Sequence, residues 1–259
     1  MTGSNADLFD VSDRLALVTG SSRGLGRALA LTLARGGARL IVHGRDADAV
    51  EQTRAEAEEL SGRPAHAVVF DVTDAAAVEA AISGVVEAVG VPDILVNNAG
   101  VQRRAPIHEF AVSDWDDIVA ANLSGVFYVS RFVTPAMVAR GSGKVVNVAS
   151  VQSRLARQTI APYSATKGGV AQLTAGMAAD LARHGIQVNA LSPGYFATEM
   201  NRALVDDPEF TRWLTQRTPA ARWGDFDELR GALLFLASDA SSFVSGQNIF
   251  VDGGMTAVV

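Results

Sequence analysis

Short apolar runs alternate along the chain with longer stretches in which apolar and polar residues recur at helical spacing. The apolar runs have the length and unbroken hydrophobic character of strands that are buried on both faces of a parallel sheet. We predict strands at residues 14–19, 38–42, 65–70, 93–97, 143–148, 186–191 and 248–251.

Segments of helical length separate these runs. They predict helices at residues 24–35, 46–60, 74–89, 112–139, 162–184 and, near the end, 225–238. Strand–helix alternation of this kind requires right-handed crossovers and a sheet covered on both sides. We therefore expect an α/β protein with one domain over residues 1–259: a doubly wound Rossmann fold with a seven-stranded parallel sheet flanked by helices on both faces. The least regular stretch, residues 194–224, is expected to form a loop and helix that cover a ligand.

Composition narrows the class of protein. With 259 residues and 48% hydrophobic content the chain can bury a core, and its net charge of −6 argues against a nucleic-acid partner. The absence of cysteine excludes disulfides, thiolate nucleophiles and cysteine-based zinc sites, and we expect no metal. The first residues do not resemble a secretion signal, and charges or glycines interrupt every apolar run. We expect a cytoplasmic protein without a membrane partner.

A glycine-rich loop follows the first predicted strand and leads into a helix. It contains Gly20, Ser22, Arg23, Gly24, Leu25 and Gly26. Glycines at such a position allow a tight turn and let the backbone approach a pyrophosphate at a helix N-terminus. The loop alone is weak evidence, because glycine turns after strands often serve only the turn.

The end of the second strand indicates which nucleotide is bound. An enzyme that uses NAD places an acidic residue there against the ribose hydroxyls, whereas this chain has Arg45. A guanidinium suits a ribose 2′-phosphate, and Arg23 could close on the same group. Asp46 is a competing acid, but its position at the start of a helix favours an N-cap. We therefore expect NADP(H) rather than NAD(H), although Arg45 could be an ordinary surface arginine.

A set of motifs in fixed order makes the assignment more specific. They are Thr19-Gly20-x-x-x-Gly24-x-Gly26, Asn97-Asn98-Ala99-Gly100, Asn122, Ser150, Tyr163-x-x-x-Lys167 and Pro193-Gly194. This combination resembles the short-chain dehydrogenase/reductase family from the first strand to Gly254, which is nearly the whole chain. The resemblance implies hydride transfer between a nicotinamide and a carbonyl or alcohol carbon of a small molecule. It also implies a homotetramer built through the helices at residues 112–139 and 162–184.

The resemblance further implies which residues hold the cofactor. The adenine is expected to contact Asp71 and Val72, and the cofactor side of the sheet Asn98, Ala99 and Gly100. Pro193, Gly194 and Thr198 are expected to position the nicotinamide. Asp71 could also be an ordinary acid at a strand end.

Tyr163 and Lys167 are the predicted catalytic pair. Four residues apart on a helix, they lie on one face, and Lys167 is one of only two lysines. We expect a nearby ammonium and an oxidised nicotinamide to lower the pKa of the phenol, so that Tyr163 acts as general base or acid. Ser150 ends a strand at the carboxyl edge of the sheet, and in the family it hydrogen-bonds the reacting oxygen. Asn122 resembles the family's fourth catalytic residue, which holds a water linking Lys167 to solvent.

Two other classes of function fit the sequence less well. A serine hydrolase is disfavoured, because the G-x-S-x-G elbow is missing and no histidine follows a suitable acid at a sheet edge. A regulatory module that binds a nucleotide without chemistry is possible on this fold. It would be expected to have lost Tyr163 or Lys167, and both are present.

The loops at residues 97–104, 181–189, 193–200 and 217–224 resemble those of the sugar-acid dehydrogenases of this family that interconvert D-gluconate and 5-keto-D-gluconate. Arg104, with possible help from Arg103, could hold a sugar-acid carboxylate, although such arginines are often solvated or paired with surface acids. Gln152 and Tyr195 are candidate partners of the substrate hydroxyls, beside Ser150 and Tyr163. A 3-oxoacyl thioester is the alternative substrate, and a steroid or xenobiotic carbonyl a third.

Overall fold

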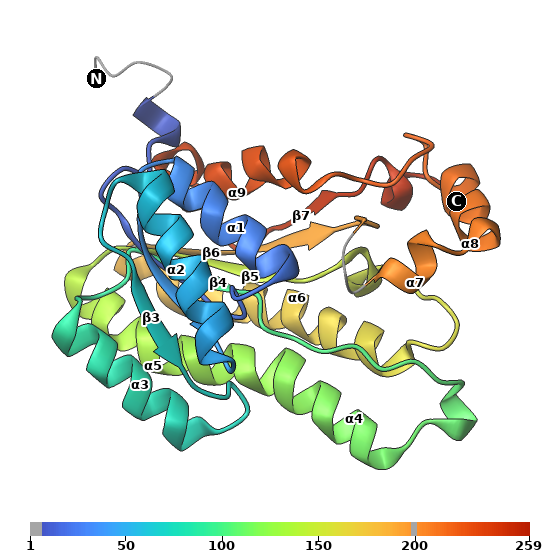
Figure 1. Ribbon diagram of the computed structural model, residues 1–259, viewed down its shortest axis with the longest axis horizontal. Helices are drawn as coiled ribbons and strands as arrows, with labels where there is room; N and C mark the ends of the chain where they lie inside the picture. Colours follow the sequence, from blue (N-terminus) through green and yellow to red (C-terminus); the bar gives the residue numbers. More distant parts are fainter. Residues whose placement is uncertain (1–6, 198–200) are drawn as a thin grey trace.

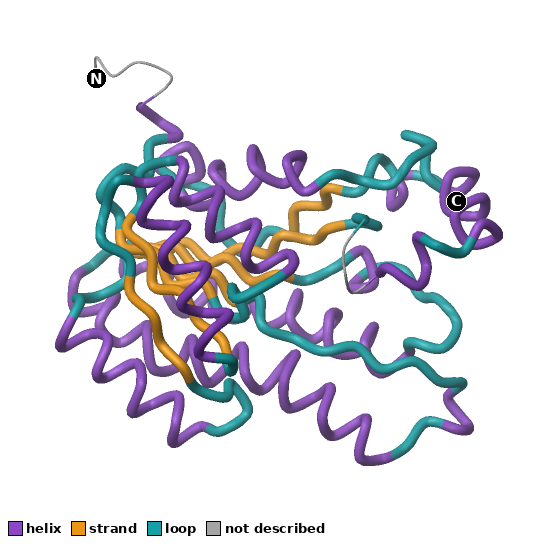
Figure 2. The backbone as a smooth tube through the Cα atoms, viewed as in Figure 1, coloured by secondary structure: helices purple, strands orange, loops and turns teal. Residues whose placement is uncertain are grey.

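The computed structural model describes residues 7–197 and 201–259, and within these ranges it contains one seven-stranded parallel sheet in the order β3-β2-β1-β4-β5-β6-β7 (Figures 1 and 2). The strands are β1 Leu15–Val18, β2 Arg39–Gly44, β3 His66–Val69, β4 Ile94–Asn97, β5 Gly143–Val148, β6 Ile186–Pro193 and β7 Asn248–Val251. The helices are α1 Gly24–Arg35, α2 Ala47–Ser61, α3 Ala75–Ala88, α4 Val112–Val119, α5 Gly125–Arg140, α6 Ala161–Leu181, α7 Arg202–Val205, α8 Pro208–Arg217 and α9 Arg230–Ala237. The predicted doubly wound fold is confirmed.

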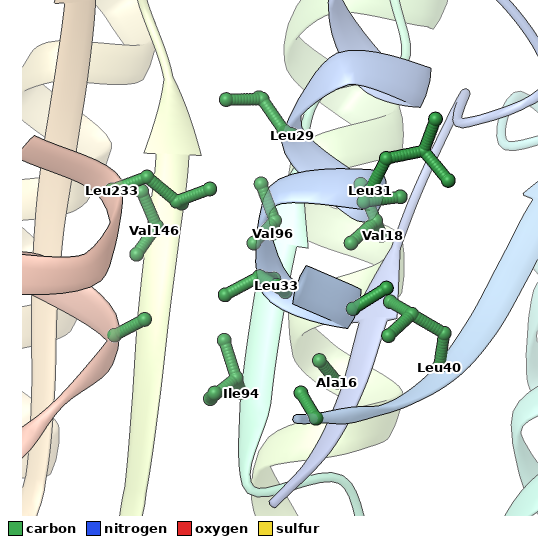
Figure 3. Packing of buried hydrophobic residues seen from close by; sticks show 14 of the residues in the cluster. Ala16, Val18, Leu29, Leu31, Leu33, Leu40, Ile94, Val96, Val146 and Leu233 are labelled. Carbon is green, nitrogen blue, oxygen red and sulfur yellow. The ribbon is translucent and has the colours of Figure 1, made fainter. Parts of the chain in front are cut away.

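Helices cover both faces of the sheet. In Figure 1, α1, α2 and α9 lie on one face, and α3, α4, α5 and α6 lie on the other. Successive residues of β1 serve the two sides, as the period of two in a strand requires: Ala16 and Val18 belong to one buried cluster, and Leu15 and Leu17 to the other. Figure 3 shows leucines of α1 and α9 packed on the first cluster. Strands buried on both sides explain why the apolar runs are continuous rather than alternating.

The strand order changes direction between β1 and β4: strands β2 and β3 are added on one side of β1, and β4 to β7 are added on the other. β1 pairs with β2 on one side and with β4 on the other, so the connections leave these two strands in opposite directions. Doubly wound sheets bind ligands outside the carboxyl ends of the strands at this switch point. The topology therefore fixes where a ligand site can form.

The predicted helix at residues 112–139 has the right span but is not uniform. A π-helical turn, Ala120–Ser124, separates α4 from α5, and it places Asn122 in the interior with no exposed surface. Single π-helical turns are frequent at functional sites, because one extra residue rotates the side chains that follow.

The irregular stretch after β6 carries two short helices. α7 and α8 lie beyond the carboxyl ends of β6 and β7 (Figure 1). Asp207 is the N-cap of α8, and its side chain accepts hydrogen bonds from the first turn. No helix in the described residues is long and apolar enough to span a bilayer.

Candidate active site

A cleft of about 600 Å³ opens at the carboxyl ends of the strands, over the β1–β4 switch point. Its walls contain nearly all the side chains and backbone predicted to hold the cofactor. These are Gly20, Ser22, Arg23, Gly24, Leu25, Gly26, Arg45, Asp71, Val72, Asn98, Ala99, Gly100, Tyr163, Lys167, Pro193 and Gly194. Thr198, also predicted, lies outside the described residues. Segments spread over more than 170 residues of sequence thus form one surface.

The glycine loop is packed too tightly for any other residue at its centre. Gly20 and Gly24 have positive φ values of 64° and 55°, a region that side chains other than glycine enter at a cost. A Cβ on Gly26 would lie 2.1 Å from the carbonyl oxygen of Gly20. Thr19 fastens this loop to the next strand, because its hydroxyl accepts hydrogen bonds from the backbone N–H groups of Asn98 (2.9 Å) and Ala99 (3.1 Å).

His43 also supports the glycine loop, and it is not among the residues predicted from the sequence. Its Nδ1 accepts a hydrogen bond from the Gly20 N–H at 3.0 Å, and its Nε2 lies 3.1 Å from the Phe70 carbonyl oxygen. Burial lowers the pKa of His43 to about 4, so the ring is neutral at pH 7, with Nε2 as the donor. A lone polar residue inside an apolar strand was the only sequence signal of this role.

The mouth of the cleft carries the two arginines expected near a 2′-phosphate. Arg23 is exposed, and Arg45 is exposed but forms an ion pair with Asp71, with 3.3 Å between Nη1 and Oδ2. The predicted N-cap role of Asp46 is confirmed, since its carboxylate accepts hydrogen bonds from the N–H groups of Asp48 and Ala49. No acidic residue other than Asp71 occupies the cleft wall in the described part of the chain. The residues present therefore fit a phosphorylated ribose.

Ser150 lies against Tyr163, which lines the cleft together with Lys167. Ser150 donates a hydrogen bond to the Tyr163 hydroxyl. The Lys167 Nζ lies 5.7 Å from the centre of the Tyr163 ring and donates a 2.7 Å hydrogen bond to the Val148 carbonyl. The face of α6 thus presents a phenol and an amine side by side, at the end of the strand that carries Ser150.

Burial controls the acidity of this group. It raises the pKa of Tyr163 to about 12, although the Ser150 hydrogen bond and the charge of Arg104 act in the opposite direction. Burial also lowers the pKa of Lys167 to about 8. Without a nicotinamide, desolvation outweighs the groups that lower the pKa of the phenol. The phenol is consequently held as a proton donor at pH 7. The expected lowering of this pKa by Lys167 together with an oxidised nicotinamide stays a prediction.

Asn122 makes contacts that its predicted role did not include. Its side-chain oxygen accepts a 2.7 Å hydrogen bond from the Val101 N–H, and its amide donates to the Val101 carbonyl at 3.0 Å. A weaker 3.4 Å hydrogen bond runs to Thr166 on α6. The side chain therefore fixes the loop after β4 against the helix of Tyr163, and the family's water-holding role stays a prediction.

The residues predicted to bind substrate fall into two groups. Arg104 lines the cleft. Arg103 also lines the cleft, but it forms ion pairs with Asp114 (3.5 Å) and Asp117 (4.0 Å) of α4. Of the two arginines, Arg103 is therefore the one that pairs with surface acids. Ser150, Gln152 and Tyr195 are not among the described residues of the cleft wall, and the Gln152 amide donates a 3.3 Å hydrogen bond to the Tyr195 hydroxyl.

A glycine loop at the switch point, together with a buried phenol, amine and hydroxyl at the adjoining strand end, defines an oxidoreductase that uses a nicotinamide nucleotide. A family model described as enoyl-(acyl carrier protein) reductase matches residues 20–256. The chain belongs to the short-chain dehydrogenase/reductase family.

Individual relatives match almost end to end. Gluconate 5-dehydrogenase of Gluconobacter oxydans is 54% identical over 98% of both chains. The 5-keto-D-gluconate 5-reductase of Escherichia coli is 49% identical over 98% of this chain and 99% of its own. A crystal structure of a gluconate 5-dehydrogenase from Burkholderia cenocepacia, in complex with NADP and tartrate, is 53% identical, covers 99% of this chain and 100% of its own, and superposes with a TM-score of 0.96.

Proposed function

We propose that this protein is an NADP(H)-dependent dehydrogenase that interconverts D-gluconate and 5-keto-D-gluconate at C5. The observation that carries the proposal is the position of Arg104, which shares the cleft with Tyr163 and whose charge reaches the phenol. Arg104 forms no ion pair with any acid in the described residues. An unpaired guanidinium close to the reacting hydroxyl suits a substrate that carries its own carboxylate. The two relatives and the protein in the NADP complex described above are named for this reaction.

The catalytic residues divide the work of proton transfer. When bound, the nicotinamide would supply the hydride to C5 or accept it. Tyr163 donates its proton to the carbonyl oxygen during reduction and accepts it during oxidation. Ser150 hydrogen-bonds the same oxygen, and Lys167 supports charge changes on the phenol from one turn along α6. Asn122 holds the Val101 loop in place and, as the family resemblance implies, the water that leads protons to Lys167.

Arg45 and Arg23 select the phosphorylated nucleotide. In this proposal the 2′-phosphate takes over the guanidinium of Arg45, whose pairing with Asp71 is exposed and long, and such pairs contribute little stability. The cost of exchanging Asp71 for a doubly charged phosphate as the partner of Arg45 is therefore small.

At the nicotinamide end of the cofactor, Thr198 joins Pro193 and Gly194.

The far end of the substrate is bound by polar groups that face the cleft. Arg104 holds the carboxylate. The side-chain oxygen of Gln102 is a buried acceptor with no partner in the described residues, and a sugar hydroxyl would supply the missing donor. Gln152 and Tyr195 are expected to meet further hydroxyls.

We also expect a cytoplasmic homotetramer, as the family resemblance implies. Val112, Trp115 and Phe127 of α4 and α5 are exposed, at 76%, 43% and 49%. Large apolar side chains in such numbers on one helical segment are typical of subunit interfaces.

An NADPH absorbance assay tests the proposal. The purified protein is given 5-keto-D-gluconate, L-sorbose and a 3-oxoacyl thioester in turn, each with NADPH and with NADH. L-sorbose has the same carbon skeleton and reacting ketone as 5-keto-D-gluconate but a hydroxymethyl group in place of the carboxylate. We expect the highest kcat/KM with 5-keto-D-gluconate and NADPH. Activity confined to the thioester would move the assignment to the alternative substrate class.

A further inference from the structure

The loop that contributes Arg104 to the cleft wall is fastened to a second loop, which leads into α6 and lies outside that wall. The backbone N–H of Ala105, next to Arg104, donates a 3.0 Å hydrogen bond to the carbonyl of Thr159. Thr159 has a φ of 68°, a left-handed conformation that is strained for a β-branched residue. The loop that contains Arg157 and leads into α6 is therefore held, at some cost, against the loop that contains Arg104 (Figure 1).

Arg157 is fixed in place on this second loop but is not neutralised. Its guanidinium lies 5.3 Å from the centre of the Phe210 ring on α8 and donates a hydrogen bond to the Tyr195 hydroxyl. Its Nε is buried without a hydrogen-bond partner. No carboxylate of the described residues forms an ion pair with it. A buried donor without a partner costs free energy that a suitable acceptor would recover.

Arg104 and Arg157 lie close enough to affect one another. Partial burial lowers the pKa of Arg104, and the positive charge of Arg157 lowers it further. Tyr163 and Tyr195 offset this repulsion only as phenolates, and burial raises the pKa of both hydroxyls, so that they are neutral at pH 7. Two guanidiniums that repel each other, one of them with a free buried N–H, form a site that an anion would stabilise.

We propose that Arg157 is a specificity-determining residue, which together with Arg104 binds the carboxylate of the substrate while Tyr163 meets its reacting oxygen. The identity of that acid as a hexonate rests on the proposed function. Tyr195 orients the guanidinium through its hydroxyl, and Phe210 supports the flat face, so that the fork is preorganised for two parallel hydrogen bonds. The excursion at residues 194–224 thereby contributes to the choice of substrate.

The test compares substrates in variants that keep the packing on Phe210. Arg157→Met retains an unbranched stem over the ring and removes the charge. We expect it to lower kcat/KM for 5-keto-D-gluconate by roughly ten- to a hundredfold, and that for L-sorbose by less than about threefold. Arg154→Met is the matched control, because Arg154 is an exposed arginine of the same loop; it should leave both values unchanged. Arg157→Lys serves as the second variant should Arg157→Met fail to fold. It keeps the charge but not the planar guanidinium, and it should lower kcat/KM for 5-keto-D-gluconate selectively, by a smaller factor.

Equal losses on the two substrates would show that Arg157 only braces α8, and would overturn the inference. A second measurement separates this outcome from failure of the proposed function. Titration of tartrate into the enzyme saturated with NADP⁺, followed by calorimetry, reports the anion site without turnover. If the wild-type enzyme is inactive on sugar acids, weaker tartrate binding in Arg157→Met still supports the anion site, and unchanged binding overturns it.

Discussion

Gly26, in the first turn of α1, is the position where the smallest added group should do the most damage. A Cβ there would lie 2.1 Å from the Gly20 carbonyl oxygen and 2.3 Å from the side-chain nitrogen of Asn98. Carbon–oxygen contacts of this type normally begin near 3.3 Å, so the glycine loop would have to move by about 1 Å. It cannot do so alone, because the Asn98 amide also donates hydrogen bonds to the Thr19 and Gly20 carbonyls.

Gly26→Ala should therefore affect the cofactor more than the fold. Overpacking of this kind costs roughly 1–3 kcal/mol, and if most of it falls on the loop geometry, NADPH binding weakens about ten- to a hundredfold. Gly84→Ala is the control. Gly84 is an exposed residue inside α3, where a Cβ would meet nothing within 4 Å, and the change should raise the free energy of unfolding by up to about 1 kcal/mol.

NADPH fluorescence titration and urea unfolding of the two variants measure these effects. Gly26 and Gly84 both lie in helices, and the expected difference between their alanine variants comes from the close approach of Gly26 to the glycine loop. A Gly26→Ala variant that binds NADPH within about twofold of the wild-type protein would refute it. A Gly26→Ala variant with an unchanged free energy of unfolding would show that the glycine loop accommodates the added Cβ without cost.

Three further outcomes are expected. Tyr163→Phe should lower kcat by roughly 10²–10⁴-fold with NADPH affinity retained, because only the proton-transferring hydroxyl is lost; steady-state rates and NADPH titration measure both, and a loss under tenfold would contradict the assignment. Arg45→Asp should move the preference from NADPH toward NADH, because it replaces an attraction to the 2′-phosphate with a repulsion; an unchanged ratio of the two kcat/KM values would place the selection elsewhere. Burial lowers the pKa of Lys144 on β5 from 10.5 to about 8, so the unfolded chain binds more protons between these values and stability rises with pH there. Urea unfolding at about pH 7.5 and about pH 9.5 measures this rise in the free energy of unfolding. Lys144→Met should reduce it by at least about 1 kcal/mol, and an equal rise in the variant and the wild-type protein would count against the prediction.

The elements of the fold were predictable because their signal is local. Each strand is a continuous apolar run, since helices cover both faces of the sheet, and the predicted strands fall within two residues of those observed. The π-helical turn at Ala120–Ser124 was not predictable, because these residues fit an ordinary helix. Its cause is tertiary: Asn122 must turn inward to reach the backbone of Val101.

The candidate site divides in the same way. The glycine loop and the Tyr163–Lys167 pair are recognisable from spacing within one turn or one helix. His43 and Arg157 gave no such signal, because their partners are distant in sequence: Gly20 for the first, Phe210 for the second. The raised pKa of Tyr163 in the cofactor-free protein gave no local signal for a related reason, since burial depends on everything packed around the phenol.

This division has a physical basis in how the two halves of the cleft are built. The cofactor half is made of short turns at strand ends, where the parallel sheet fixes the geometry and few alternatives are possible. The substrate half is made where the loops around Ala105 and Thr159 and the helix α8 meet, with contacts between segments more than 50 residues apart. Substitutions there change which side chains reach the cleft without disturbing the sheet. Proteins with the same catalytic pair can therefore differ in substrate, and in this chain the arginines at 104 and 157 are where that difference should be sought.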